Sequence, residues 1–171
     1  GAVNILSKLI SPFFNKIFPE VPKGHPVYGS IMMNLSANML GLDNAATPMG
    51  LKAMRELQEL NPTKERASNA QIMFLVLNTS GLTIIPITIM AYRTQCGAAN
   101  PSDIFIPTLI ATFFSTIAGL IAVSIVQRIN LFNKVVIAYI GGLSLLIATL
   151  LWNIAKLDSK TIEQYSAVVS G

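Results

Sequence analysis

The chain has 171 residues, of which 52% are hydrophobic and only 12% are charged, whereas soluble domains carry about 25% charged residues. This composition excludes an ordinary soluble domain and predicts an all-α integral membrane protein. One cysteine and one histidine exclude a disulfide framework and the usual Cys/His metal sites. The net charge of +4 comes from basic residues that lie between apolar runs, which indicates membrane topology rather than nucleic-acid binding.

Residues 2–18 predict an amphipathic helix. Apolar pairs recur every four positions, at Ile5/Leu6, Leu9/Ile10, Phe13/Phe14 and Ile17/Phe18. One apolar and one polar face are typical of a helix that lies in the headgroup plane, so we expect an N-terminal interfacial helix. A core helix of a soluble fold is the alternative. The following "FPEVPKGHP" predicts a short loop.

Three later segments, 67–92, 104–127 and 135–155, contain no charged residue, and each meets or exceeds the roughly 20 residues that a transmembrane helix needs. We expect each to cross the membrane. Segment 26–42 is also apolar but shorter, and its length suits a half-span as well as a full one.

The distribution of positive residues favours a re-entrant hairpin over a full span for 26–42. If the three long segments alternate in direction, one side of the membrane carries Lys52, Arg55, Lys64, Arg66, Arg128 and Lys134, and the other carries Arg93, Lys156 and Lys160. The richer side is expected to be cytoplasmic. Only a hairpin keeps the N-terminal lysines, Lys8, Lys16 and Lys23, on that side too. A full span followed by a surface helix remains the alternative.

The expected hairpin has a polar turn. Its first half-helix runs from about Pro26 to Leu42, "DNAATP" forms the turn, and a second helix begins at Pro48. Gly41 would permit close approach of another segment at this turn.

A second polar interruption lies within segment 67–92. Asn78, Thr79, Ser80 and Gly81 occupy its middle, and Pro86 removes a backbone hydrogen bond, so we expect a helix that is broken near Asn78–Gly81. Backbone groups freed at that depth must be buried in protein or line a wet cavity.

We expect the turn and the break to meet near the bilayer midplane and to form one polar ligand-binding pocket. Its predicted residues are Asn34, Asn38, Asp43, Asn44, Thr47, Asn78, Thr79, Ser80 and Thr83. Amides can recognise a neutral polar ligand, and the carboxylate of Asp43 could bind Na⁺ or carry a proton. The same side chains could instead be interhelical hydrogen bonds, with Asp43 capping a helix or pairing with Lys52.

The sequence contains no catalytic triad order, nucleophile elbow, phosphate-binding loop or metal-ligand spacing, so we expect no enzymatic activity, no metal and no cofactor beyond an ion. An envelope enzyme that acts on a lipid or cell-wall precursor is a weaker option, because no nucleophile is recognisable.

The blocks "NLSANMLGLDNAATPMGLKAMRELQELNP" and "ASNAQIMFLVLNTSGLTIIPITIMAYR" resemble the spore maturation protein A group of the nucleoside-recognition (Gate) membrane proteins. The resemblance runs from about Ser7 to Gln127. It implies a multi-pass protein of the bacterial inner membrane that acts with a spore maturation protein B-like partner or fused half. It also implies similarity to nucleoside transporters whose sites lie between hairpins and broken helices.

The resemblance predicts a Gate-like domain over 1–127, lacking N-terminal helices, and an extra helix and linker over 128–171. The chain begins with Gly1, so we expect a part of a longer protein. Two functions follow: a transport or permeation module for a small polar solute, or a non-transporting assembly protein of the envelope or spore core. Both predict contact with lipid and an oligomer, and neither predicts nucleic-acid binding.

Overall fold

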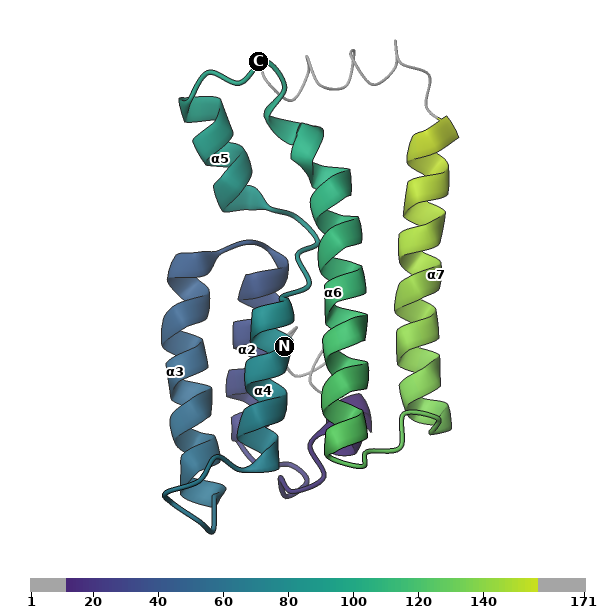
Figure 1. Cartoon of the computed structure of the whole chain (residues 1–171). Helices are drawn as coiled ribbons and strands as arrows, with labels where there is room; N and C mark the ends of the chain where they lie inside the picture. The colour runs from purple at the N-terminus through teal and green to yellow at the C-terminus, as the bar shows by residue number, and fades with distance from the viewer. Residues whose placement is uncertain (1–11, 157–171) are drawn as a thin grey trace. The chain divides into compact units, whose positions relative to one another are not determined.

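The computed structural model describes residues 12–156, and every regular element in that range is helical. Residues 12–17 form one helix, and the others are α2 (Val27–Met39), α3 (Asp43–Leu60), α4 (Asn69–Ser80), α5 (Ile87–Gln95), the 3₁₀-helix η1 (Pro101–Ile104), α6 (Phe105–Val126) and α7 (Lys134–Lys156) (Figure 1). The all-α prediction is confirmed for these residues. The chain divides into two compact units between Asn133 and Lys134.

The predicted N-terminal interfacial helix is only partly within the described residues, because residues 2–11 lie outside them. In the described part, Phe14, Ile17 and Phe18 are buried. The Phe14 ring stacks on Tyr28, with 6.3 Å between the ring centroids. These three side chains of the described part therefore pack inside the protein.

Helices α2 and α3 lie side by side as a helical hairpin with a very short turn (Figure 1). Gly41 has a φ of +61°, which lets the N–H of Leu42 donate to the carbonyl of Ala37 at 2.9 Å. The prediction that the second helix begins at Pro48 is wrong, since α3 begins at Asp43 and includes this proline. Pro48 removes only the helical bond to the carbonyl of Asn44, an exposed residue in the first turn of α3.

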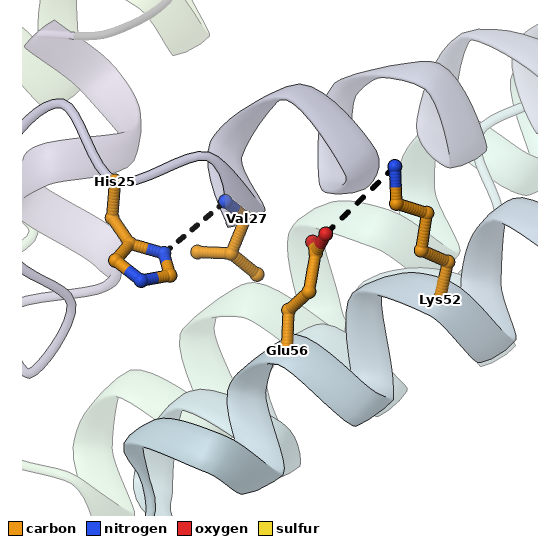
Figure 2. Close-up of polar contacts among 4 residues, drawn as sticks. All are labelled: His25, Val27, Lys52 and Glu56. Atoms are coloured by element: carbon orange, nitrogen blue, oxygen red, sulfur yellow. Dashed lines mark hydrogen bonds and ion pairs between the residues drawn. The ribbon is translucent and has the colours of Figure 1, made fainter.

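The base of the hairpin begins with a histidine ring instead of a conventional cap. Pro26 is the N-cap of α2 and has no side-chain hydrogen bond, but Nδ1 of His25 accepts from the N–H of Val27 at 3.2 Å. Figure 2 shows this contact beside α3, where Lys52 and Glu56 point toward each other, with 3.8 Å between Nζ and Oε1. The start of α2 is thus held by a local side chain.

The predicted break is present, but it lies a few residues later than expected. Helix α4 begins with a capping box formed by Ser68 and Gln71, and Asn78–Ser80 are its last turn. Gly81 ends it with a φ of +35°, and residues 81–86 are not helical. Pro86 then precedes α5. Residues 67–92 are therefore two short helices joined by an unwound segment.

Two helices in the described residues are long and apolar enough to cross a membrane: Pro101–Val126, which joins η1 to α6, and Lys134–Asn153 within α7. On α6 the side chains of Phe114, Ile125 and Val126 are more than half exposed, as expected of a lipid-facing surface. Of the three predicted spans, these two form continuous helices. The third is the interrupted α4–α5 segment.

Candidate functional site

The tip of the α2–α3 hairpin and the unwound segment 81–86 are in direct contact. The carbonyl of Met39, at the end of α2, accepts from the N–H of Ile84 at 2.7 Å and from that of Ile85 at 3.0 Å. The hydroxyl of Thr88, in the first turn of α5, donates to the carbonyl of Gly41. Backbone groups that the break frees from helical pairing are thereby satisfied by the hairpin tip.

Gly41 is required at this contact for two reasons. Its φ of +61° is unfavourable for residues with a side chain. A Cβ atom at this position would also lie 3.1 Å from Ile87 N and Pro86 Cα, and 3.2 Å from Ile85 O. These are backbone atoms, so they cannot move aside easily. The predicted role of Gly41 in close approach is confirmed.

Helix α6 supports the break from another direction. The hydroxyl of Thr112 accepts from the N–H of Thr83 at 3.1 Å, and the hydroxyl of Thr116 donates to the carbonyl of Ser80 at 3.3 Å. Gly119 faces the same helix end, since a Cβ there would lie 3.1 Å from Val76. The sequence signal for these contacts is the spacing of Thr112 and Thr116, which places both hydroxyls on one face of α6.

An amide pair connects the hairpin to α4. Nδ2 of Asn78 donates to the carbonyl of Phe74 at 2.8 Å, and Oδ1 of Asn78 accepts from Nδ2 of Asn38 at 2.8 Å. A carbonyl can only accept, so this contact fixes which way the Asn78 amide faces and therefore which atom Asn38 presents to it. Oδ1 of Asn38 is left without a partner among residues 12–156.

A cavity of about 200 Å³, which we call the chamber, lies where the tip and the break meet. It is lined by Asn38, Gly41, Asp43, Asn78, Gly81, Thr83, Pro86 and Ile89. Asp43 is the charged residue in this lining, and its exposed carboxylate has no partner in the described part of the chain. It lies in the first turn of α3, where a negative charge is favoured by the helix dipole.

A more open cavity of about 400 Å³, the groove, lies between α2, α3 and α4. It is lined by Asn34, Asn38, Ala46, Thr47, Gly50, Leu51, Met54, Phe74, Leu75 and Asn78. Asn34 is only 3% exposed, and its Nδ2 donates to the carbonyl of Ala46 at 2.8 Å. Oδ1 of Asn34 has no partner among the described residues. Asn38 and Asn78 line both cavities, so their amide pair forms the wall between chamber and groove.

The nine predicted site residues therefore separate into three groups. Asn38, Asp43, Asn78 and Thr83 line the chamber, and Asn34 and Thr47 line only the groove. Asn44, Thr79 and Ser80 line neither. Asn44 and Thr79 are exposed, and the hydroxyls of Thr79 and Ser80 donate to the carbonyl of Val76 within their own helix. Their polar atoms are at the surface or used locally.

The alternatives considered for Asp43 are not observed. Asp43 lies inside α3 and Leu42 is the N-cap, so Asp43 is not a cap. Lys52 pairs with Glu56. Within the described residues no group of three His, Cys, Asp or Glu side chains could hold a metal ion.

Comparison with known proteins places the chamber within a recognised region. A family model described as nucleoside recognition (Gate) matches residues 1–95, more than half of the chain and all nine predicted site residues. Spore maturation protein A of Bacillus subtilis (strain 168) is 44% identical over 121 residues, which are 71% of this chain and 62% of that protein. The chain thus spans less than two thirds of that relative. No solved structure matches it.

Proposed function

The chain belongs to the nucleoside recognition (Gate) family of membrane proteins, and from this premise we propose that it forms the solute-binding part of a transport or permeation module. The observation that carries the proposal is the chamber. An unwound helix and a hairpin tip meet there, and polar side chains line a cavity in a chain that is otherwise strongly apolar. Such discontinuous helices are typical of transporter sites.

We propose the following arrangement in the bacterial inner membrane. Helices α6 and α7 cross it as continuous spans, α4 and α5 together make a third, interrupted crossing, and the α2–α3 hairpin is re-entrant. The length and apolar character of α6 and α7 support the first part. Segment 81–86 depends on the hairpin tip for its backbone hydrogen bonds. This supports the interrupted crossing and the re-entrant hairpin, because unpaired backbone groups cannot face lipid.

Asp43 is the proposed site of ion coupling. A carboxylate without a partner inside a polar cavity can bind Na⁺ or carry a proton, and either would link solute binding to an ion gradient. We further propose that the chain acts in an oligomer or with a spore maturation protein B-like partner or fused half. Its similarity to spore maturation protein A supports the choice of partner.

The proposal is tested by solute uptake into vesicles that contain the full-length protein with its partner. Asp43→Asn and Asn78→Ala each alter the chamber and should lower uptake about tenfold or more. Asn44→Ala is the matched control, since Asn44 is an exposed neighbour of Asp43 outside both cavities. Unchanged uptake in both chamber variants would remove the site assignment.

The second candidate is a non-transporting assembly protein. It is favoured by the number of polar side chains that bond within the protein, such as Thr79, Ser80 and Thr83. This function predicts that the chamber variants lower the yield of the complex and its melting temperature while no solute raises that temperature. A bound ligand at 100 times its Kd should stabilise the protein by about 2.7 kcal/mol, which separates the two functions.

A further inference from the structure

The partners of the chamber's polar side chains specify the kind of solute that it can hold. Three side-chain oxygens in the lining lack a partner among the described residues: both carboxylate oxygens of Asp43 and Oδ1 of Asn38. The amide nitrogens of Asn38 and Asn78 each already donate one hydrogen bond. The hydroxyl hydrogen of Thr83 is used by the carbonyl of Gly81 at 3.2 Å.

This imbalance is set by the backbone of α4. The Phe74 carbonyl orients the amide of Asn78, and the amide of Asn78 orients that of Asn38. The atom of Asn38 that remains for a ligand is therefore the acceptor Oδ1. Each amide nitrogen keeps a second N–H, so the lining is not limited to acceptors. However, every polar side-chain heavy atom in the lining that lacks a hydrogen-bond partner among the described residues is an acceptor.

The charge of the chamber lining also favours a solute that donates hydrogen bonds. Two helix C-termini, those of α2 and α4, and two N-termini, those of α3 and α5, meet at the tip and the break, so their dipoles largely offset one another. Asp43 is the ionisable residue in the lining, and no basic side chain is part of it. A solute that brings positive charge and N–H donors would complement this lining.

The cavity volume limits the size of the solute. About 200 Å³ is below the range of about 300–1,000 Å³ that is usual for pockets of drug-sized ligands. We therefore propose that the chamber binds a compact primary ammonium cation, held by the Asp43 carboxylate and by Oδ1 of Asn38. This inference rests on the proposed function, because it names the solute class of the same site.

The test is equilibrium binding to the purified full-length protein with its partner, at constant ionic strength. Methylammonium carries a charge and N–H donors, tetramethylammonium carries the charge alone, and urea carries donors without a charge. We expect methylammonium to bind about tenfold more tightly than either control. Sodium is a further arm, and it should compete with methylammonium because both would occupy Asp43.

Two chamber variants and one control variant relate the binding to the geometry. Asp43→Asn should weaken methylammonium binding about tenfold, and Asn44→Ala should leave it unchanged. Asn78→Leu should release the Asn38 amide, so that the preference for methylammonium over urea falls about fivefold. Asp43 is exposed, so its variant should fold even if the Asn78 variant does not.

The outcomes separate this inference from the function on which it rests. Preferential methylammonium binding that depends on Asp43 supports both. Binding of a neutral nucleoside such as uridine, with no response to methylammonium, would overturn the solute class and keep the binding function. Equal binding of methylammonium and tetramethylammonium would overturn the role of the N–H donors. No binding of any probe would overturn both proposals.

Discussion

Two polar clusters at opposite ends of α3 and α4 differ in how completely they are paired. At the loop between these helices, each side-chain amide atom of Gln58, Asn61 and Gln71 has a hydrogen-bond partner. At the hairpin tip, Asn38 and Asp43 keep unpaired oxygens beside the chamber. A closed network of this kind stabilises a loop, whereas an open one leaves polar groups for a ligand.

The closed cluster should be the more sensitive to mutation. Asn61 is 3% exposed, and its Nδ2 lies 2.6 Å from the carbonyl of Arg66 and 3.1 Å from Oε1 of Gln71. Asn61→Leu would leave buried groups unpaired and should lower the free energy of unfolding by about 3 kcal/mol. Thermal unfolding in detergent measures this. A loss no larger than that of an exposed Asn44→Leu would mean that the network is not a stabilising unit.

The contact between tip and break should be next in sensitivity. Gly41→Ala adds a Cβ atom against backbone at a positive φ and should cost about 2 kcal/mol. Gly24→Ala is the matched control, because Gly24 also has a positive φ, +78°, but no atom within 4 Å of the new Cβ. Equal melting temperatures for the two variants would show that the tip does not press against the break.

The open cluster should tolerate loss of an amide better than the closed one. Asn38 is half-buried, and its side chain makes one hydrogen bond among the described residues, to Asn78, so Asn38→Leu should cost about 1 kcal/mol of stability. The same variant should weaken methylammonium binding to the chamber about fivefold, less than the loss expected for Asp43→Asn. Comparing its melting temperature with that of Asn61→Leu measures the difference between the two clusters. A larger loss for Asn38→Leu would reverse their roles.

The ion pair between Lys52, which is exposed, and Glu56, whose side chain is only 20% exposed, should contribute least of all. Lys52 is 64% exposed on its side chain, and its Nζ lies 3.8 Å from Oε1 of Glu56 (Figure 2). Lys52→Ala should change stability by no more than about 0.5 kcal/mol, and this small effect should vanish at high salt. Melting curves at two salt concentrations check it. A salt-independent loss as large as that of Asn61→Leu would place Lys52 in a buried network.

The sequence allowed the break and the turn to be predicted, because their causes are local. Gly81 and Pro86 interrupt any helix through their own backbone properties, and Gly41 permits a left-handed turn. The start of α3 was misplaced for a related reason. Proline usually lies at the beginning of a helix. Helix α3 nevertheless tolerates Pro48 in its interior, because this proline costs the helix only one exposed backbone hydrogen bond.

The pairing within the site could be predicted only in part. The sequence indicated that polar residues of the turn and the break converge, but it did not distinguish Asn38, which bonds to α4, from Asn44, which is exposed on the surface of the chain. That difference depends on the rotation of each helix about its axis. The orientation of the Asn38 amide depends on the carbonyl of Phe74, a backbone group that any residue would supply. No residue pattern reveals it.

The double hydrogen bond to the carbonyl of Met39 has a consequence for how the protein is made. Ile84 and Ile85 are synthesised more than forty residues after their acceptor, so the residues of the hairpin are present before the segment that bonds to them. In the membrane arrangement that we propose, these two N–H groups would be unsatisfied without that acceptor, and residues 81–86 would gain by coiling into a helix instead. We therefore expect the interruption to form only when the earlier hairpin docks, which makes membrane insertion of the two parts an ordered process.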